Sequence, residues 1–166
     1  CNIMPEADYS IYDFKDVLIS EAIFTKNSKL PKHRNFLREV TYKSLYCTVL
    51  PSADYSIYDF EGISIDGAKF TDDSKIPDDK DLFQKIYRKS ISNSELPSKD
   101  YSNYNLAGVD ISGATFSKNS KLKITKTLFQ DFANSNIMGT SLPRGDYRIC
   151  SFKEVAVKFS KFTKDS

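Results

Sequence analysis

The stretch LPSADYSIYDFEGISIDGAKFTDDSK, residues 50–75, decides the fold because related stretches recur along the whole chain. They begin at Met4, Leu96 and Leu142, and they keep a constant interval of 46 residues. A fixed period of about 20–50 residues is typical of an array of stacked units. We therefore predict one repeat domain over residues 1–166, with repeats at about 1–46, 47–92, 93–138 and 139–166.

A second, shorter period lies within each repeat, where large apolar residues stand five apart. In the second copy they are Leu45, Leu50, Tyr55, Phe60, Ile65 and Phe70. A period of five fits neither a helix, at 3.6, nor a strand, at 2. It predicts a chain that turns a corner every five residues and points these side chains into a common interior. The Asp and Ser residues between them suit such corners, because their short side chains hydrogen-bond to nearby backbone.

The segment ADYSI-YDFEG-ISIDG-AKFTD, residues 53–72, resembles four consecutive units of the pentapeptide-repeat family, whose pattern is A-(D/N)-(L/F)-(S/T)-X. The resemblance implies a right-handed four-sided β-helix. Some positions depart from the pattern: Tyr58 and Ile63 are large where the family has a small residue, and Lys99 also occurs there. Such residues indicate local bulging or a contact outside a regular coil.

The remaining residues of each repeat break the pentads and predict short helices near 33–43, 79–89 and 125–134. In the second copy, Asp78 or Asp79 can cap the helix start. One helix face carries apolar residues: Leu82, Phe83, Ile86 and Tyr87. The predicted fold is thus a β-solenoid with helical insertions, about two coils plus one short α-helix per 46-residue repeat. Two coils advance about 9.6 Å, which matches the roughly 8–10 Å between packed helices; one coil per repeat is the alternative.

Recurring polar and aromatic residues have structural interpretations. The tyrosine column, which could be a stacking platform for a polymer, is interpreted as core: Tyr9, Tyr55, Tyr101 and Tyr147. The preceding aspartates are interpreted as turn residues, because calcium requires about six to eight oxygens close together. We predict no metal, cofactor or catalytic site.

Histidine and cysteine are the other candidates for chemistry. His33, the only histidine, is interpreted as an exposed residue beside a helix start. Cys1 and Cys47 are one repeat apart, too far for a disulfide, which requires Cα atoms within about 7 Å. We predict three mostly buried free thiols with Cys150, typical of a reducing compartment, cytoplasmic or a host cytosol reached by secretion.

The charge balance does not favour a nucleic-acid or membrane partner. The chain has 24 basic and 22 acidic residues and a net charge of +2, which gives no argument for nucleic acid, an anionic membrane or mimicry of DNA. The basic runs at 29–34 and 118–123 correspond to an acidic run at 72–81, whereas a nucleic-acid groove would keep its sign. No apolar run approaches the roughly 20 residues of a membrane span, and no signal peptide is visible.

We therefore predict a non-catalytic bacterial scaffold that binds a protein, since stacked repeats offer long rigid faces. The predicted partner surface is the outer helix row: Arg34, Arg38, Lys80, Gln84, Lys85, Arg88, Gln130 and Asp131. The family resemblance adds two alternatives, a targeting or substrate-binding domain of a secreted effector whose catalytic domain lies elsewhere, and a gyrase-interacting DNA mimic. The chain starts and stops within repeats, which predicts a piece of a longer protein, although a mature lipoprotein would also begin with Cys. Open ends predict end-to-end self-association.

Overall fold

The computed structural model describes residues 2–163. Strands and helices are short throughout this range. The strands are β1 (Asn2–Ile3), β2 (Ala22–Ile23), β3 (Glu95–Leu96), β4 (Thr115–Phe116), β5 (Ser141–Leu142) and β6 (Lys161–Phe162). The α-helices are α1 (Phe36–Glu39), α2 (Leu82–Lys85) and α3 (Leu128–Asp131), and the 3-10 turns are η1 (Tyr9–Ile11), η2 (Thr41–Lys43), η3 (Tyr87–Lys89), η4 (Ala133–Ser135) and η5 (Tyr147–Ile149).

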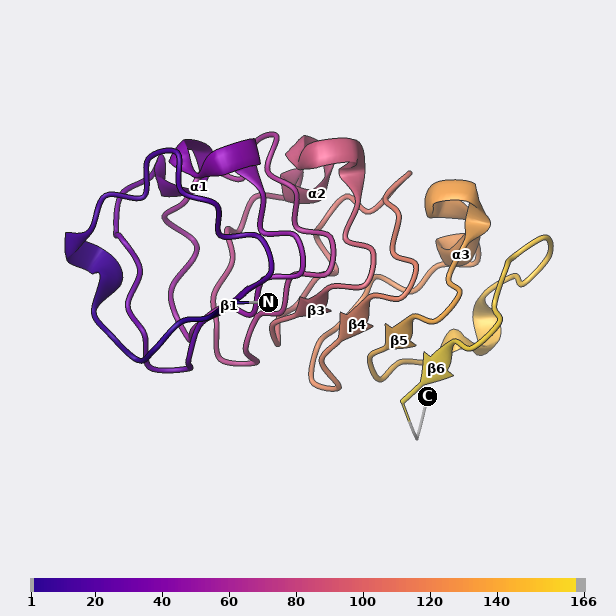
Figure 1. The fold of residues 1–166 in the computed structure, drawn as a ribbon. Helices are drawn as coiled ribbons and strands as arrows, with labels where there is room; N and C mark the ends of the chain where they lie inside the picture. The colour runs from indigo at the N-terminus through magenta and orange to yellow at the C-terminus, as the bar shows by residue number, and fades with distance from the viewer. Residues whose placement is uncertain (1, 164–166) are drawn as a thin grey trace.

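The strands form two small parallel sheets, in the orders β1-β2 and β3-β4-β5-β6. Strands β3 to β6 lie side by side, and α1, α2 and α3 form a row on the opposite edge of the molecule (Figure 1). Isolated parallel bridges at Val49 and Lys69 connect β2 to β3. Paired residues along this ladder are separated by 20 and by 26 residues in alternation, so each 46-residue repeat contributes two steps.

The predicted right-handed four-sided β-helix is wrong. The described residues form sheets of only two and four strands together with three short helices, and they do not close into a solenoid. The fold is a small α/β arrangement of short parallel strands.

The physical reason lies in the frequency of the corners. Asp16, Gly62, Gly108 and Glu154 share one repeat position, and all four have φ between 58° and 70°. Left-handed backbone turns the chain sharply, and such residues recur through the chain. The interval between corners leaves room for two-residue strands, and pairing elsewhere is reduced to single bridges such as Asp54 with Lys75.

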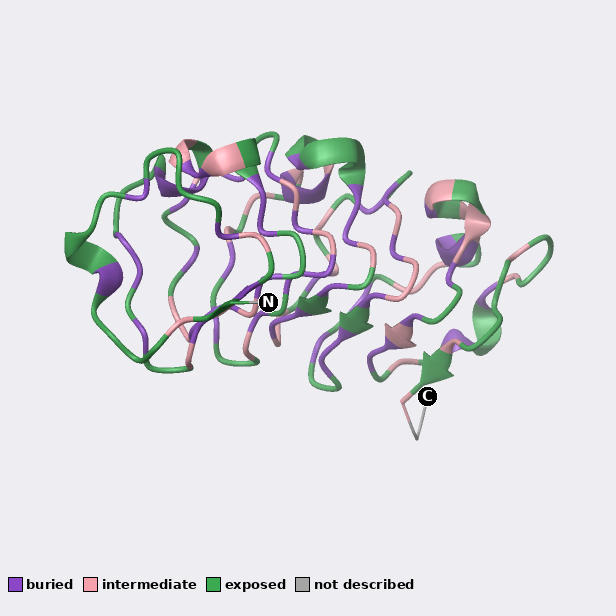
Figure 2. Ribbon diagram, in the orientation of Figure 1, coloured by how far each residue is buried: buried purple, intermediate pink, exposed green. Residues whose placement is uncertain are grey.

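The interior follows the five-residue spacing in the second and third copies (Figure 2), whereas Phe152, Val157 and Phe162, the corresponding residues of the fourth copy, are exposed. The tyrosine column is buried, as predicted, with exposed fractions of 8% or less. Each hydroxyl donates to the carbonyl of the proline four residues earlier, in the pairs Tyr9–Pro5, Tyr55–Pro51, Tyr101–Pro97 and Tyr147–Pro143. A buried hydroxyl is costly unless it is hydrogen-bonded, and this local acceptor allows tyrosine to occupy the core.

The aspartate column stabilises turns, which confirms that prediction. Asp54 Oδ1 accepts a hydrogen bond of 3.0 Å from the Ser56 N–H, and Asp100 Oδ1 accepts one of 2.9 Å from the Ser102 N–H. Asp8 and Asp146 make the same contact two residues ahead. Hydrogen bonding to the charged carboxylate lowers its pKa; for Asp8 the hydrogen bond from the Ser10 hydroxyl is the largest cause, and the pKa falls to about 2.

The helices are shorter than predicted, at four residues each. After α2, Ile86 is extended and Arg88 has φ 57°, which stops the helix at Lys85. Of the two predicted caps, Asp79 accepts from the N–H of Asp81 at 2.9 Å, directly before α2, and thus satisfies an amide at the helix start, whereas Asp78 pairs with Lys99. The early stop also makes Tyr87 half-exposed, so its predicted place on the buried helix face is wrong.

Candidate functional site

Three residues of the predicted partner surface bind the chain itself. Arg38, Gln84 and Gln130 occupy one repeat position at the end of α1, α2 and α3. Arg38 Nη1 contacts Asp59 Oδ2 at 2.8 Å. Gln84 Nε2 donates to the carbonyls of Asn105 and Ala107, at 3.1 and 2.8 Å.

Gln130 repeats the arrangement of Gln84 one repeat later. Its Nε2 donates to the carbonyls of Ser151 and Lys153, at 3.0 and 3.1 Å. These side chains therefore fasten each helix to a segment 21–23 residues further along the chain. The side-chain amide donors of Gln84 and Gln130 are occupied within the molecule, which makes these two residues poor candidates for a partner contact.

We expect Gln84→Ala to lower the free energy of unfolding by about 1–2 kcal/mol, because two backbone carbonyls lose a donor. Urea denaturation followed by circular dichroism measures this change. The matched control is Lys80→Ala, an exposed residue two positions before α2, with an expected change within about 0.5 kcal/mol. Equal effects of the two substitutions would contradict the fastening role.

Two of the remaining helix-row residues line one groove. Arg34 and Lys85 line a groove of 430 Å³ with Asp59, Glu61 and Asp79. Lys85 Nζ lies 2.5 Å from Asp79 Oδ2, so part of this charge is neutralised internally.

Three further side chains complete the predicted row. Asp131 Oδ2 accepts a hydrogen bond of 3.2 Å from the Thr127 hydroxyl. Lys80 is exposed. Arg88 lies beyond the helix, in η3.

Arg88 belongs to a different groove, of 500 Å³, which we call the tyrosine groove. Its lining residues are Tyr42, Ser44, Tyr46, Ser64, Asp66, Tyr87 and Arg88. The three tyrosines are unusually exposed, at 84%, 48% and 47% for Tyr42, Tyr46 and Tyr87. Other aromatic side chains, such as Tyr55 and Phe83, are buried in the core, so three exposed tyrosines on one solvent-facing groove need an explanation.

Backbone geometry positions the groove. Tyr42 and Arg88 occupy one repeat position, with φ 61° and 57°, in the turns that follow α1 and α2. The turns are anchored to preceding segments, because the Thr41 N–H donates to the Val17 carbonyl at 2.9 Å and the Tyr87 N–H donates to the Ile63 carbonyl at 3.0 Å.

Polar contacts within the chain position several residues that line the tyrosine groove. Ser44 and Ser64 form a parallel bridge, and Asp66 Oδ1 accepts a hydrogen bond of 2.5 Å from the Ser90 hydroxyl. The Arg88 guanidinium carbon lies 5.0 Å from the centre of the Tyr87 ring. The neighbouring Cys47 thiol is the main cause of a raised pKa at Tyr46, with smaller contributions from burial, Glu21 and Asp66.

Sequence reasoning missed this groove. The signal that could have found it is that Tyr42 lies outside the pentads, where the five-residue spacing does not bury it. Tyr46 and Tyr87 gave no such signal, because their exposure depends on where the neighbouring helices end.

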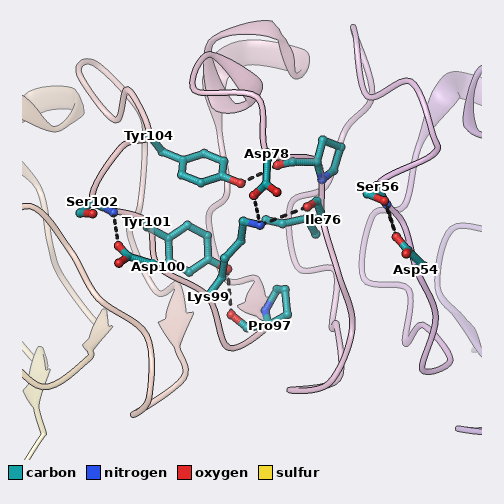
Figure 3. Close-up of polar contacts among 11 residues, drawn as sticks. Asp54, Ser56, Ile76, Asp78, Pro97, Lys99, Asp100, Tyr101, Ser102 and Tyr104 are labelled. Atoms are coloured by element: carbon teal, nitrogen blue, oxygen red, sulfur yellow. Dashed lines mark hydrogen bonds and ion pairs between the residues drawn. The ribbon is translucent and has the colours of Figure 1, made fainter.

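Lys99, which stands at a small position of the pentad pattern, is accommodated by contacts within the chain (Figure 3). Its Nζ pairs with Asp78 and lies 3.4 Å from the Ile76 carbonyl. It also lies 5.8 Å from the centre of the Tyr104 ring, whose hydroxyl donates to the Pro77 carbonyl. Burial is the largest single influence on the pKa of Lys99 and lowers it, but the contacts with Asp78 and Tyr104 together outweigh burial, and the net pKa is raised. A lysine held in its charged form is a structural cation rather than a nucleophile.

The candidate catalytic side chains lie apart in unrelated contacts. His33 Nε2 is 3.6 Å from Glu39 Oε2, on the exposed flank of α1 as predicted. Cys150 is buried near the Thr125 carbonyl, and burial raises the pKa of its thiol. Cys47 is exposed, contrary to the expectation of mostly buried thiols, and Cys1 lies outside the described residues. Within residues 2–163, no three His, Cys, Asp or Glu side chains are grouped so as to hold a metal ion.

Among residues 2–163, no helix has the length and the apolar character needed to cross a bilayer. Comparison of the chain with protein-family models, with curated proteins and with solved structures found no match. The resemblance to pentapeptide repeats therefore stays a prediction from the pentads.

Proposed function

We propose that the chain is a non-catalytic scaffold that binds another protein through the tyrosine groove. The observation that carries this proposal is the grouping of Tyr42, Tyr46 and Tyr87 in a solvent-open groove of 500 Å³ beside Arg88. Tyrosine and arginine are enriched among residues that dominate protein-binding energy. The groove thus supplies both apolar area and polar groups that can orient a partner.

The rigidity of the groove also supports binding. Backbone hydrogen bonds tie η2 and η3 to earlier segments, and tyrosine has only two side-chain torsions to immobilise. A preformed surface loses less conformational entropy when a partner docks, which favours affinity.

Panning a random peptide library against the chain tests the proposal. We expect the library to yield peptides that bind the wild type. The same peptides should bind the Tyr42→Ser/Tyr87→Ser variant at least about 30-fold more weakly, because this variant loses two residues that dominate the contact. The matched control is Tyr12→Ser, which removes an exposed tyrosine outside the groove and is expected to leave binding unchanged.

Circular dichroism of both variants checks that they remain folded. Failure to enrich any peptide, or equal binding by the groove variant and the wild type, would overturn the proposed function.

A further inference from the structure

The rim of the tyrosine groove on the η2 and η3 side is positively charged. Lys43, Arg88 and Lys89 lie in these two turns, and their φ values of 48°, 57° and 49° fix them in left-handed backbone. None of the three forms an ion pair with any residue from 2 to 163. By contrast, Lys29, Lys69 and Lys85 each contact a carboxylate.

One carboxylate, that of Asp66, is among the residues that line the groove. The Asp66 carboxylate accepts a hydrogen bond from the hydroxyl of Ser90, the residue that follows η3. The two turns therefore place three cations beside a groove that is lined by one carboxylate. This excess of positive charge fits an acidic partner.

The spacing of the groove residues indicates the conformation of the partner. Tyr42 and Arg88 are one repeat apart, which corresponds to two steps of the parallel ladder, as between Val49 and Glu95. Neighbouring parallel strands are about 4.8 Å apart, so two steps advance roughly 9.6 Å. A polyproline II helix repeats every three residues with a rise of about 3.1 Å each, or about 9.3 Å per turn.

An extended strand fits this spacing less well. Its side chains return to one face every two residues, or about 6.7 Å. Tyrosine-lined grooves are also the surfaces on which proline-rich segments dock, because the proline rings pack against the aromatic faces.

We propose that the tyrosine groove binds an acidic, proline-rich protein segment in the polyproline II conformation. The prolines pack on Tyr42, Tyr46 and Tyr87, and the partner's carboxylates pair with Lys43, Arg88 and Lys89. This inference rests on the proposed function and names the class of partner.

Isothermal titration calorimetry with synthetic peptides tests the inference. The first peptide alternates proline pairs with glutamate; in the second peptide alanine replaces every proline, and in the third lysine replaces every glutamate. We expect the first to bind about tenfold or more tightly than either of the others, since loss of preorganised prolines and loss of charge pairing each weaken binding.

Charge reversal supplies the matched variants. Arg88→Glu is expected to weaken the glutamate peptide and to strengthen the lysine peptide, whereas Arg88→Gln weakens only the former. The control Lys121→Glu, an exposed lysine of another part of the chain, should leave both affinities unchanged.

Equal affinity for the proline and alanine peptides would overturn the inference, as would no detectable heat with the first peptide. If library peptides without proline bind the groove while the synthetic proline peptides do not, the inference falls and the proposed function stands. If no library peptide binds either, both fall.

Discussion

Replacing Phe83 by alanine is expected to lower the free energy of unfolding by about 3–5 kcal/mol. The Phe83 side chain projects from α2 and is fully buried. Its ring centre lies 6.1 Å from that of Tyr101 and 5.5 Å from that of Tyr104. Alanine would leave a cavity between the helix row and the tyrosine column. The four-residue helix α2 is too short to fill this cavity by moving inward.

Urea denaturation monitored by circular dichroism measures the loss. The control is Phe159→Ala, because Phe159 is 73% exposed and has few contacts to lose; the expected change is within about 0.5 kcal/mol. A loss below about 1 kcal/mol for Phe83→Ala would show that α2 is not held by this ring.

Alkaline pH is expected to unfold the protein through its buried tyrosines. Burial raises the pKa of Tyr58 to about 12 and raises the pKa of Tyr55, Tyr101 and Tyr147 further. The Tyr58 hydroxyl also donates to the Pro31 carbonyl at 2.7 Å, a bond that exists only in the neutral form.

The sign follows from the two protonation equilibria. An unfolded tyrosine has a pKa of about 10, so the folded state retains the proton more strongly. The stability from each neutral tyrosine is therefore complete below about pH 10 and is lost as pH rises through the folded pKa. All four groups lose stability from about pH 10 upward; the loss from Tyr58 is complete near pH 12, and the loss from the other three continues above it.

The urea midpoint measured at a series of pH values from neutral to strongly alkaline checks this prediction. Tyr58→Phe should make the alkaline decline shallower, and it should cost about 1–3 kcal/mol at neutral pH because the Pro31 carbonyl loses its donor. The control Tyr42→Phe, whose ring lies in solvent, should leave the slope unchanged. A flat stability profile through this alkaline range would contradict the buried hydroxyls.

The sequence predicted the interior well because inward spacing is a local property. Tyr55, Phe60 and Ile65 stand five apart and all three are buried. The aspartate turns were equally predictable, since Asp54 and Ser56 are only two residues apart. The sheet was not predictable: a corner every five residues left two-residue strands and single bridges where a continuous β-helix was expected.

The candidate site was mostly hidden from sequence reasoning. Gln84 resembles a free surface residue in the sequence, yet it binds carbonyls 21 and 23 residues away. Tyr87 resembles a core residue of a longer helix, yet α2 ends before it.

The repeat of 46 residues, the buried positions and the turn residues were thus determined by the amino-acid sequence itself. They depend on spacing and on contacts between residues close together in the chain. The length of each helix, the fastening role of Gln84 and the exposure of Tyr42 were decided only by the tertiary structure, because each depends on which distant segment supplies a carbonyl, a carboxylate or a covering side chain.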